Sequence, residues 1–144
     1  CSPFPAASCC MKFYFDENFS PRIARGLNVL EKDKNIEVVN IIDEFGRGAA
    51  DEEWIPVVGD EEKFVITQDF NLHRIRQQRE LYIQYKLGIF IFRPPAKRGF
   101  LYWDWVEFII KKGEQVKQKA IHSSKPFGFM ISSRTSKAVD LNEV

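Results

Sequence analysis

Carboxylate side chains recur in this 144-residue chain where apolar runs end and where a short helix is expected to begin. They are Asp16 and Glu17, Asp51 and Glu52, and Asp69. Because the C-terminal ends of parallel strands meet at one edge of a sheet, we expect these residues to converge there. Converging carboxylates repel one another unless a cation lies between them. Oxygen ligands suit Mg²⁺ or Mn²⁺, whereas zinc favours histidine or cysteine, so the pattern favours a hard-metal site.

Each acidic position also fits a purely structural role. Asp16 fits the cap of a turn, and Asp51 fits a helix N-terminus, where the helix dipole favours an anion. Asp69 fits an N-cap, because its side chain can accept hydrogen bonds from the first backbone amides of a helix. Three such positions on one predicted edge favour the metal site, and the structural roles remain the alternative.

Amide and basic side chains near the acidic positions suit a ligand that contains phosphate. Asn18 and Asn71 are expected to hydrogen-bond a phosphate oxygen or a water of the metal. Arg22 and Arg74 lie on helices that are expected to start at this edge, and Arg93 follows the fourth predicted strand. The arginine fork binds phosphate through two hydrogen bonds. Each of these residues also fits a solvated surface position.

The elements that must position these residues alternate between strand and helix. Ser20 followed by Pro21 predicts a helix start, and the β-branched run at 36–42 predicts a strand. In full, the expected strands are 12–15, 36–42, 63–67, 88–92 and 127–132, and the expected helices are 21–31, a short one from 51, 70–86 and 100–120. The alternation predicts an α/β fold, a three-layer α/β/α sandwich with a mostly parallel central sheet of four to five strands.

The composition predicts one domain at residues 11–132. All three cysteines lie in residues 1–10, which are expected to be a disordered leader, natural or added for expression; residues 133–144 are expected to be a flexible tail.

The net charge is +1, and no apolar run approaches the roughly 20 residues of a membrane helix. Acidic residues dominate 31–62 and basic residues dominate 70–125, which fits a cation site beside a polyanion-binding surface or two differently solvated faces. A cytoplasmic location is the expectation.

Aromatic residues cluster at the start of the last predicted helix. They are Phe100, Tyr102, Trp103 and Trp105. Such rings can stack on nucleic-acid bases. They can equally pack the helix on the sheet, with surplus apolar surface covered by a partner or by a second copy in a homodimer.

Three segments together resemble the PIN-like nucleases. They are Phe-Asp-Glu-Asn-Phe-Ser-Pro (15–21), Gly-Ala-Ala-Asp-Glu-Glu (48–53) and Val-Ile-Thr-Gln-Asp-Phe (65–70). The nearest group is that of compact prokaryotic PIN-like proteins, which includes toxin ribonucleases of VapBC-type toxin–antitoxin systems. The resemblance covers about residues 11–95. It implies Mg²⁺- or Mn²⁺-dependent cleavage of RNA and, for a toxin, a cognate antitoxin.

The resemblance also assigns roles by position. It implies that Asp16 is the first metal ligand, that Asp51 or Glu52 is the second, and that Asp69 is the third. Thr67 would shape the turn before the third acid. Asn71 stands where many PIN domains have a further acidic residue, and the fourth strand ends in Arg93-Pro94, so the resemblance does not extend to a second metal.

Two hypotheses follow, with a weaker third. The first is an endoribonuclease in which Asp16, Asp51 and Asp69 hold a metal and Glu17 or Glu52 orients the attacking water. The alternative is a PIN-like module that binds nucleic acid or protein with little or no turnover. A flavodoxin-like phospho-acceptor ranks below both, because it requires a lysine after the last strand, whereas Lys125 precedes that strand.

Overall fold

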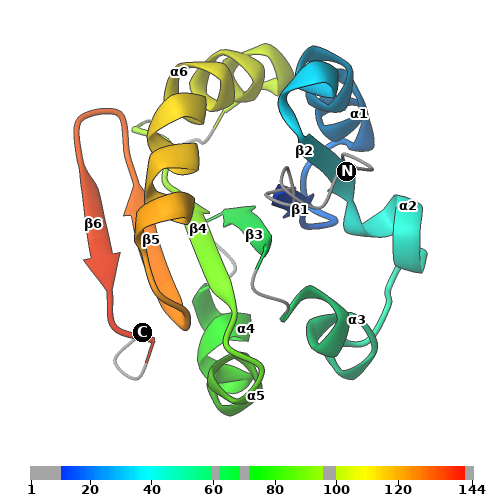
Figure 1. The fold of residues 1–144 in the computed structure, drawn as a ribbon, viewed down its shortest axis with the longest axis vertical. Coiled ribbons are helices and arrows are strands. Elements are labelled where there is room, and N and C mark those ends of the chain that lie inside the picture. Colours follow the sequence, from blue (N-terminus) through cyan, green and yellow to red (C-terminus); the bar gives the residue numbers. More distant parts are fainter. Residues whose placement is uncertain (1–10, 60–61, 69–71, 96–99, 142–144) are drawn as a thin grey trace.

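The structure is a computed structural model that describes residues 11–59, 62–68, 72–95 and 100–141. Its strands are β1 (Met11–Phe15), β2 (Ile36–Asn40), β3 (Lys63–Gln68), β4 (Gly88–Phe92), β5 (Phe127–Ile131) and β6 (Ser136–Val139). Its helices are α1 (Pro21–Leu30), the short 3₁₀ helix η2 (Lys32–Lys34), α2 (Ile41–Phe45), α3 (Asp51–Val58), α4 (Leu72–Gln77), α5 (Arg79–Gln84) and α6 (Tyr102–His122). Figure 1 shows their arrangement.

The strands form a six-stranded sheet in the order β2-β1-β3-β4-β5-β6. The first five are parallel, and β6 is antiparallel to β5. The α/β class and the mostly parallel sheet are therefore confirmed, with one strand more than expected among the described residues. The strand order reverses between β1 and β3, and ligands of open α/β sheets bind beyond the C-terminal strand ends at such a switch point.

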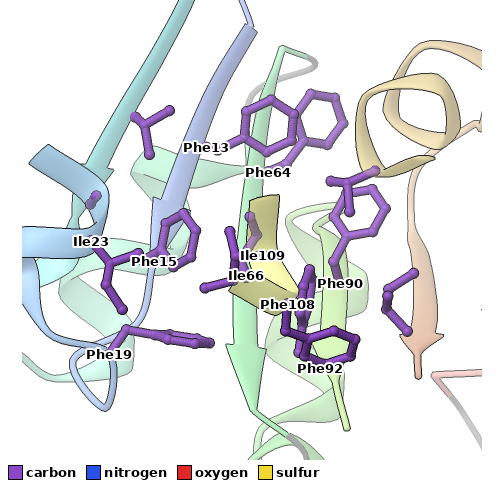
Figure 2. Packing of buried hydrophobic residues seen from close by; sticks show 14 of the residues in the cluster. Phe13, Phe15, Phe19, Ile23, Phe64, Ile66, Phe90, Phe92, Phe108 and Ile109 are labelled. Atoms are coloured by element: carbon purple, nitrogen blue, oxygen red, sulfur yellow. The ribbon is translucent and has the colours of Figure 1, made fainter. Parts of the chain in front are cut away.

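Alternate residues of each strand point to opposite faces, which produces three layers. Phe13 and Phe15 of β1 face α1 and α6, whereas Tyr14 between them faces the layer of α2 to α5. Figure 1 shows α1 and α6 on one side of the sheet and α3, α4 and α5 on the other. Figure 2 shows the first of these cores, with Phe13, Phe15, Phe64, Phe90 and Phe92 of the sheet directed toward Phe108 and Ile109 of α6. Burying each such ring stabilises the fold by roughly 1.5–3 kcal/mol.

The crossover through α6 has the opposite hand to the other three. From β3 to β4 and from β4 to β5 the chain steps in the same direction across the sheet. The first step runs through α4 and α5 on one face, whereas the second runs through α6 on the other. The steps through α1 and through α2 and α3 share the hand of the α4–α5 step, because each change of direction is matched by a change of face. Since about 98% of such crossovers are right-handed, the position of α6 beside α1 is not expected from pattern alone.

The second strand is shorter than predicted. It ends at Asn40, and Ile41 begins α2. The Asn40 side chain caps this helix, because its Oδ1 accepts a hydrogen bond from the backbone N of Ile42 at 2.8 Å. The β-branched residues Ile41 and Ile42 made the segment look like a continuous strand, and the cap outweighs their propensity.

Two further expectations are wrong. The helix predicted at 70–86 is, in its described part, two helices that break at Gln78 (φ −110°, ψ 17°), where the residue type carries no break signal. Residues 136–139, expected in a flexible tail, form β6 along β5, with Ile131 opposite Ser136. A turn held by a 2.8 Å bond from Ser132 N to Thr135 O joins the two strands. The added strand covers backbone groups that β5 would otherwise expose.

The first helix is as predicted. Ser20 is its N-cap, and its side chain accepts a hydrogen bond from Arg22 N at 3.3 Å, with Pro21 in the first turn. The cap places the start of α1 directly after the loop that carries Asp16. Among the helices in the described ranges, none is both long and apolar enough to cross a membrane.

Candidate active site

Buried polar side chains gather at the C-terminal edge of the sheet. Within the described ranges, the buried polar or charged residues are Asp16, Asn40, Asp51, Thr67 and Gln68. They lie just after β1, at the ends of β2 and β3, and at the start of α3. Burying a polar group is unfavourable unless it is hydrogen-bonded, so such a concentration at one edge marks a site rather than a packing core.

Asp16 is 8% exposed and is held by its neighbours in sequence and in the sheet. Its backbone N donates to Ile66 O at 3.0 Å, which keeps it beside β3. One carboxylate oxygen accepts from Asn18 N at 3.0 Å, and the other accepts from the Thr67 hydroxyl. The carboxylate therefore has a defined orientation at the switch point between β1 and β3.

Asn40 is fully buried and fixes the loop after β1. Its Nδ2 donates to the carbonyl oxygen of Asp16 at 3.2 Å and to that of Phe19 at 3.0 Å. Sequence reasoning missed this residue. The signal was present, because an asparagine followed by Asp43 and Glu44 is typical of a helix N-cap with an acidic first turn.

Asp51 is 5% exposed and forms a forked ion pair with Arg74 of α4. Arg74 Nε donates to Asp51 Oδ2 at 3.2 Å, and Nη2 donates to Oδ1 at 2.6 Å. The hydrogen bond to Asp51 is the main reason that the pKa of Arg74 is raised. The same guanidinium lies 3.8 Å from Glu17 Oε1, and Glu17 Oε2 accepts from Gly48 N at 3.1 Å. Arg74 thus links the acidic group after β1 with the acidic group at α3.

Tyr82 of α5 lies beneath both carboxylates. Burial raises its pKa above the ordinary tyrosine value, the charges of Asp51 and Asp16 raise it further, and Arg74 lowers it. A cavity of about 30 Å³, lined among others by Asp16, Thr67, Arg74 and Tyr82, separates these groups. The rest of its lining is apolar, from Trp54, Val65, Ile75 and Ile89. Tyr82 and Arg74 line this cavity together with Asp16, and Arg74 also binds Asp51, so both carboxylates lie around the same groups.

The predicted site residues divide into four groups. The structure brings together Asp16, Glu17, Asp51, Thr67 and Arg74. Three others are exposed around it: Asn18, whose backbone alone contacts Asp16, Glu52 beside Asp51, and Arg93 after β4. Arg22 lies on the opposite face of the sheet, at a groove between α1 and α6. Asp69 and Asn71 lie outside the described residues.

The side chains at this edge fit a hard cation by their chemistry. The buried donors are carboxylate oxygens, which Mg²⁺ and Mn²⁺ prefer. No group of three acidic, histidine or cysteine side chains within the described ranges is arranged to hold a metal ion. The third predicted ligand, Asp69, lies outside those ranges. The assignment of Asp16, Asp51 and Asp69 as ligands therefore stays a prediction.

A family model described as a PIN like domain matches residues 11–94. The match covers more than half of the chain, so the chain belongs to the PIN-like domain family. It extends from β1 through β4 and includes every acidic position discussed above. Neither the curated proteins nor the solved structures yielded a match. Membership of this family indicates a nuclease-type or nucleic-acid-binding module, and PIN-like nucleases typically use divalent metals.

Proposed function

We propose that this chain is an endoribonuclease that depends on Mg²⁺ or Mn²⁺ and acts at the C-terminal edge of β1 and β3. The observation that carries the proposal is the pair of buried carboxylates, Asp16 and Asp51, at the switch point of a PIN-like sheet. Buried charge is unfavourable for stability, and it is retained where it performs chemistry.

Different residues of the site would bind the metal, orient its ligands and accept a proton. Asp16, Asp51 and Asp69 would hold the metal, which, when bound, polarises the phosphate and lowers the pKa of a water. Thr67 and the Asn18 backbone orient the Asp16 carboxylate through their hydrogen bonds. The hydrogen bond from Gly48 N orients the Glu17 carboxylate, which would accept the proton of the attacking water.

Other side chains would bind the substrate or replace Glu17. Glu52 is the alternative proton acceptor, since it is exposed beside Asp51. Arg74 is half-exposed, so its fork can bind a phosphate oxygen when it leaves Asp51. Arg93 and Asn71 extend the contact with the phosphate backbone.

An RNA cleavage assay with Mn²⁺ or Mg²⁺ tests the proposal. The variants are Asp16→Asn, Asp51→Asn and Asp69→Asn, and the matched control is Asp43→Asn. Asp43 is an acidic residue on the exposed end of α2 that pairs with Arg25. We expect each site variant to lose at least about 100-fold in rate and the control to keep the parent rate. Cleavage that survives the site substitutions, or that needs no divalent ion, contradicts the mechanism.

One observation favours the alternative, a binding module without turnover. The Asp51 carboxylate is already neutralised by Arg74, so a cation occupies the second acidic position. RNA binding without cleavage at any metal concentration would support this alternative. Cleavage that Asp51→Asn abolishes would exclude it.

The phospho-acceptor hypothesis loses support. Lys125 Nζ donates to the carbonyl oxygen of Lys63, at the start of β3. This is the N-terminal edge of the sheet, opposite Asp16.

A narrower role as a toxin in the cytoplasm, silenced by an antitoxin, is supported by the sequence resemblance. Growth arrest on induction, relieved by the product of a neighbouring gene, tests it. The inactive Asp16→Asn variant should not arrest growth.

A further inference from the structure

The aromatic cluster at the start of α6 is divided between core and surface. Trp105 is 9% exposed, and its ring lies 5.1 Å from that of Phe19. Tyr102 is 41% exposed and Trp103 is 74% exposed. The exposed pair is not needed to pack the helix, because Trp105, Phe108 and Ile109 already do so. With Leu101, which is 76% exposed, Tyr102 and Trp103 form a run of three exposed apolar residues, and contiguous exposed apolar surface marks binding sites.

The exposed pair lies near the candidate active site. Phe19 N donates to Asp16 O at 3.2 Å, and the Phe19 ring contacts Trp105. Two contacts therefore connect Asp16 with the first turn of α6. Both α1 and α6 follow strands of the parallel sheet, so both begin at its C-terminal edge.

A groove of about 320 Å³ runs between these two helices. Its lining is mostly apolar and contains one charged side chain, that of Arg22, which lies at one end of α1 with Leu30 at the other. The aromatic residues of the lining are Tyr102 and Trp103. The Tyr102 and Trp103 rings meet edge to face, with centroids 5.3 Å apart and planes at 85°. The volume lies at the lower end of the range for small-ligand sites.

Gly26 indicates that the groove is kept open. A Cβ added at this position would have nothing within 4 Å, so packing does not require glycine there. Glycine inside a helix destabilises it by about 1 kcal/mol relative to alanine. The wall of the groove at Gly26 therefore carries no side chain, although there is room for one.

Arg22 supplies the positive charge of the groove. No side chain in the described part of the molecule pairs with its guanidinium, whereas Arg25 is bound to Asp43 and Arg74 to Asp51. A flat ring beside an unpaired guanidinium matches a nucleotide, because the ring can stack on the base and the fork can bind the phosphate. An apolar protein segment would leave the Arg22 charge without a partner.

We propose that the Trp103–Arg22 groove is a nucleotide subsite that receives one unstacked base of the RNA strand, away from the cleaved phosphate. The subsite rests on the proposed function for its substrate class. In this subsite Trp103 stacks on the base and Arg22 binds the phosphate of that nucleotide.

Affinity for a single-stranded RNA oligonucleotide, measured by fluorescence anisotropy in EDTA, tests the subsite without cleavage. We expect Trp103→Ala to weaken binding by about 5- to 100-fold and Trp103→Phe to retain most of it. Ile121→Ala is the matched control, because Ile121 is also exposed on α6 but lies near its far end. Placing one abasic nucleotide at successive positions should reproduce the loss at a single position, and Trp103→Ala should be insensitive to that change.

A second pair of variants separates charge from shape. Gly26→Gln and Gly26→Glu add side chains of similar size to the groove, and both residues favour a helix. Greater loss of RNA affinity in the glutamate variant, reduced at high salt, is expected for a phosphate ligand.

Three results have distinct meanings. Equal RNA affinity in the parent and Trp103→Ala overturns the subsite, whatever the cleavage assay shows. A change of molecular mass in Trp103→Ala, with RNA affinity unchanged, identifies the groove as a contact between copies and also overturns it. Trp103-dependent binding by a chain that cleaves no RNA supports the subsite and contradicts the nuclease proposal alone.

Discussion

Asp16 and Asp51 are both buried carboxylates at one edge of the sheet, yet they are held in different ways. Asp16 accepts hydrogen bonds from a hydroxyl and a backbone amide, and its own backbone is bound by β3 and Asn40. Asp51 is held by the charged fork of Arg74, a side chain that is 41% exposed. The first carboxylate is fixed by short contacts from the strand framework, whereas the second depends on one long side chain.

This difference separates a preorganised position from an exchangeable one. Short neutral donors orient Asp16 before any ligand arrives, which is what a catalytic group requires. Arg74 neutralises Asp51 and also lies near Glu17, so it balances the site's charge. When the pair separates, Asp51 can bind a metal cation and Arg74 can bind a phosphate. The predictions that follow test each half of the comparison.

The largest effect is expected from Asn40→Ala, which removes the framework around Asp16. The carbonyl oxygen of Phe19 loses the Asn40 donor, that of Asp16 keeps only the bond from Phe19 N, and the Ile42 amide in the first turn of α2 loses its cap. We expect the free energy of unfolding to fall by about 3 kcal/mol, measured by urea denaturation. The control is Asn28→Ala, because Asn28 is exposed and its Oδ1 accepts a single hydrogen bond, from Val38 N. Similar losses in both variants would show that Asn40 has no special role.

Arg74→Met tests whether Asp51 can exchange its arginine partner. It leaves Asp51 buried without its main partner, and we expect a loss of about 2 kcal/mol, less than for a fully buried pair because Arg74 is partly exposed. Arg76→Met removes the same charge from an exposed position on α4 and should cost under about 0.5 kcal/mol. Added Mn²⁺ should stabilise Arg74→Met more than the parent. Equal stabilisation would mean that Arg74 does not compete with the metal.

Thr67→Val should have a smaller effect, because it removes a single donor to Asp16. A buried acceptor without its donor costs about 1–3 kcal/mol, and we expect the lower end since Asn18 N still donates. Thr67→Ser keeps the hydroxyl and should lie between the parent and the valine variant in urea denaturation. A valine variant as stable as the parent would show that groups other than Thr67 orient the Asp16 carboxylate.

Much of the fold was predictable because its signals are local. Ser20-Pro21 marks the start of α1, and the short apolar run of β4 has the predicted bounds. The sequence-based predictions failed where tertiary contacts determine the secondary structure. Asn40 ends β2 because its side chain has partners in the loop after β1, and β6 forms because β5 offers an edge. Neither partner lies next to the segment in sequence.

That Asp16 and Asp51 lie at one edge of the sheet was predictable, whereas their pairing was not; the role of Asp69 stays a prediction. Strand ends and a helix start identified Asp16 and Asp51 by position. Spacing did not reveal that Arg74 would reach Asp51 across 23 positions, or that Arg22 would face a different groove from the other arginines. Side-chain direction depends on which face of the sheet each helix covers, and the unusual hand of the α6 crossover places α6 on the face that α1 covers.

Tyr82 provides the smallest effect at neutral pH and the most direct comparison of the two carboxylates. Its pKa is raised by burial and then by Asp51 and Asp16. As pH rises through about 10, the unfolded chain releases the tyrosine proton first, so the parent should lose up to about 1.4 kcal/mol of stability per pH unit through this group. Tyr82→Phe should lose less over the same range in urea denaturation. Tyr14, whose pKa is raised to about 12, contributes equally to both proteins and cancels in their difference. Identical slopes for parent and variant would mean that neither burial nor the carboxylates raise the pKa of Tyr82 in the folded chain.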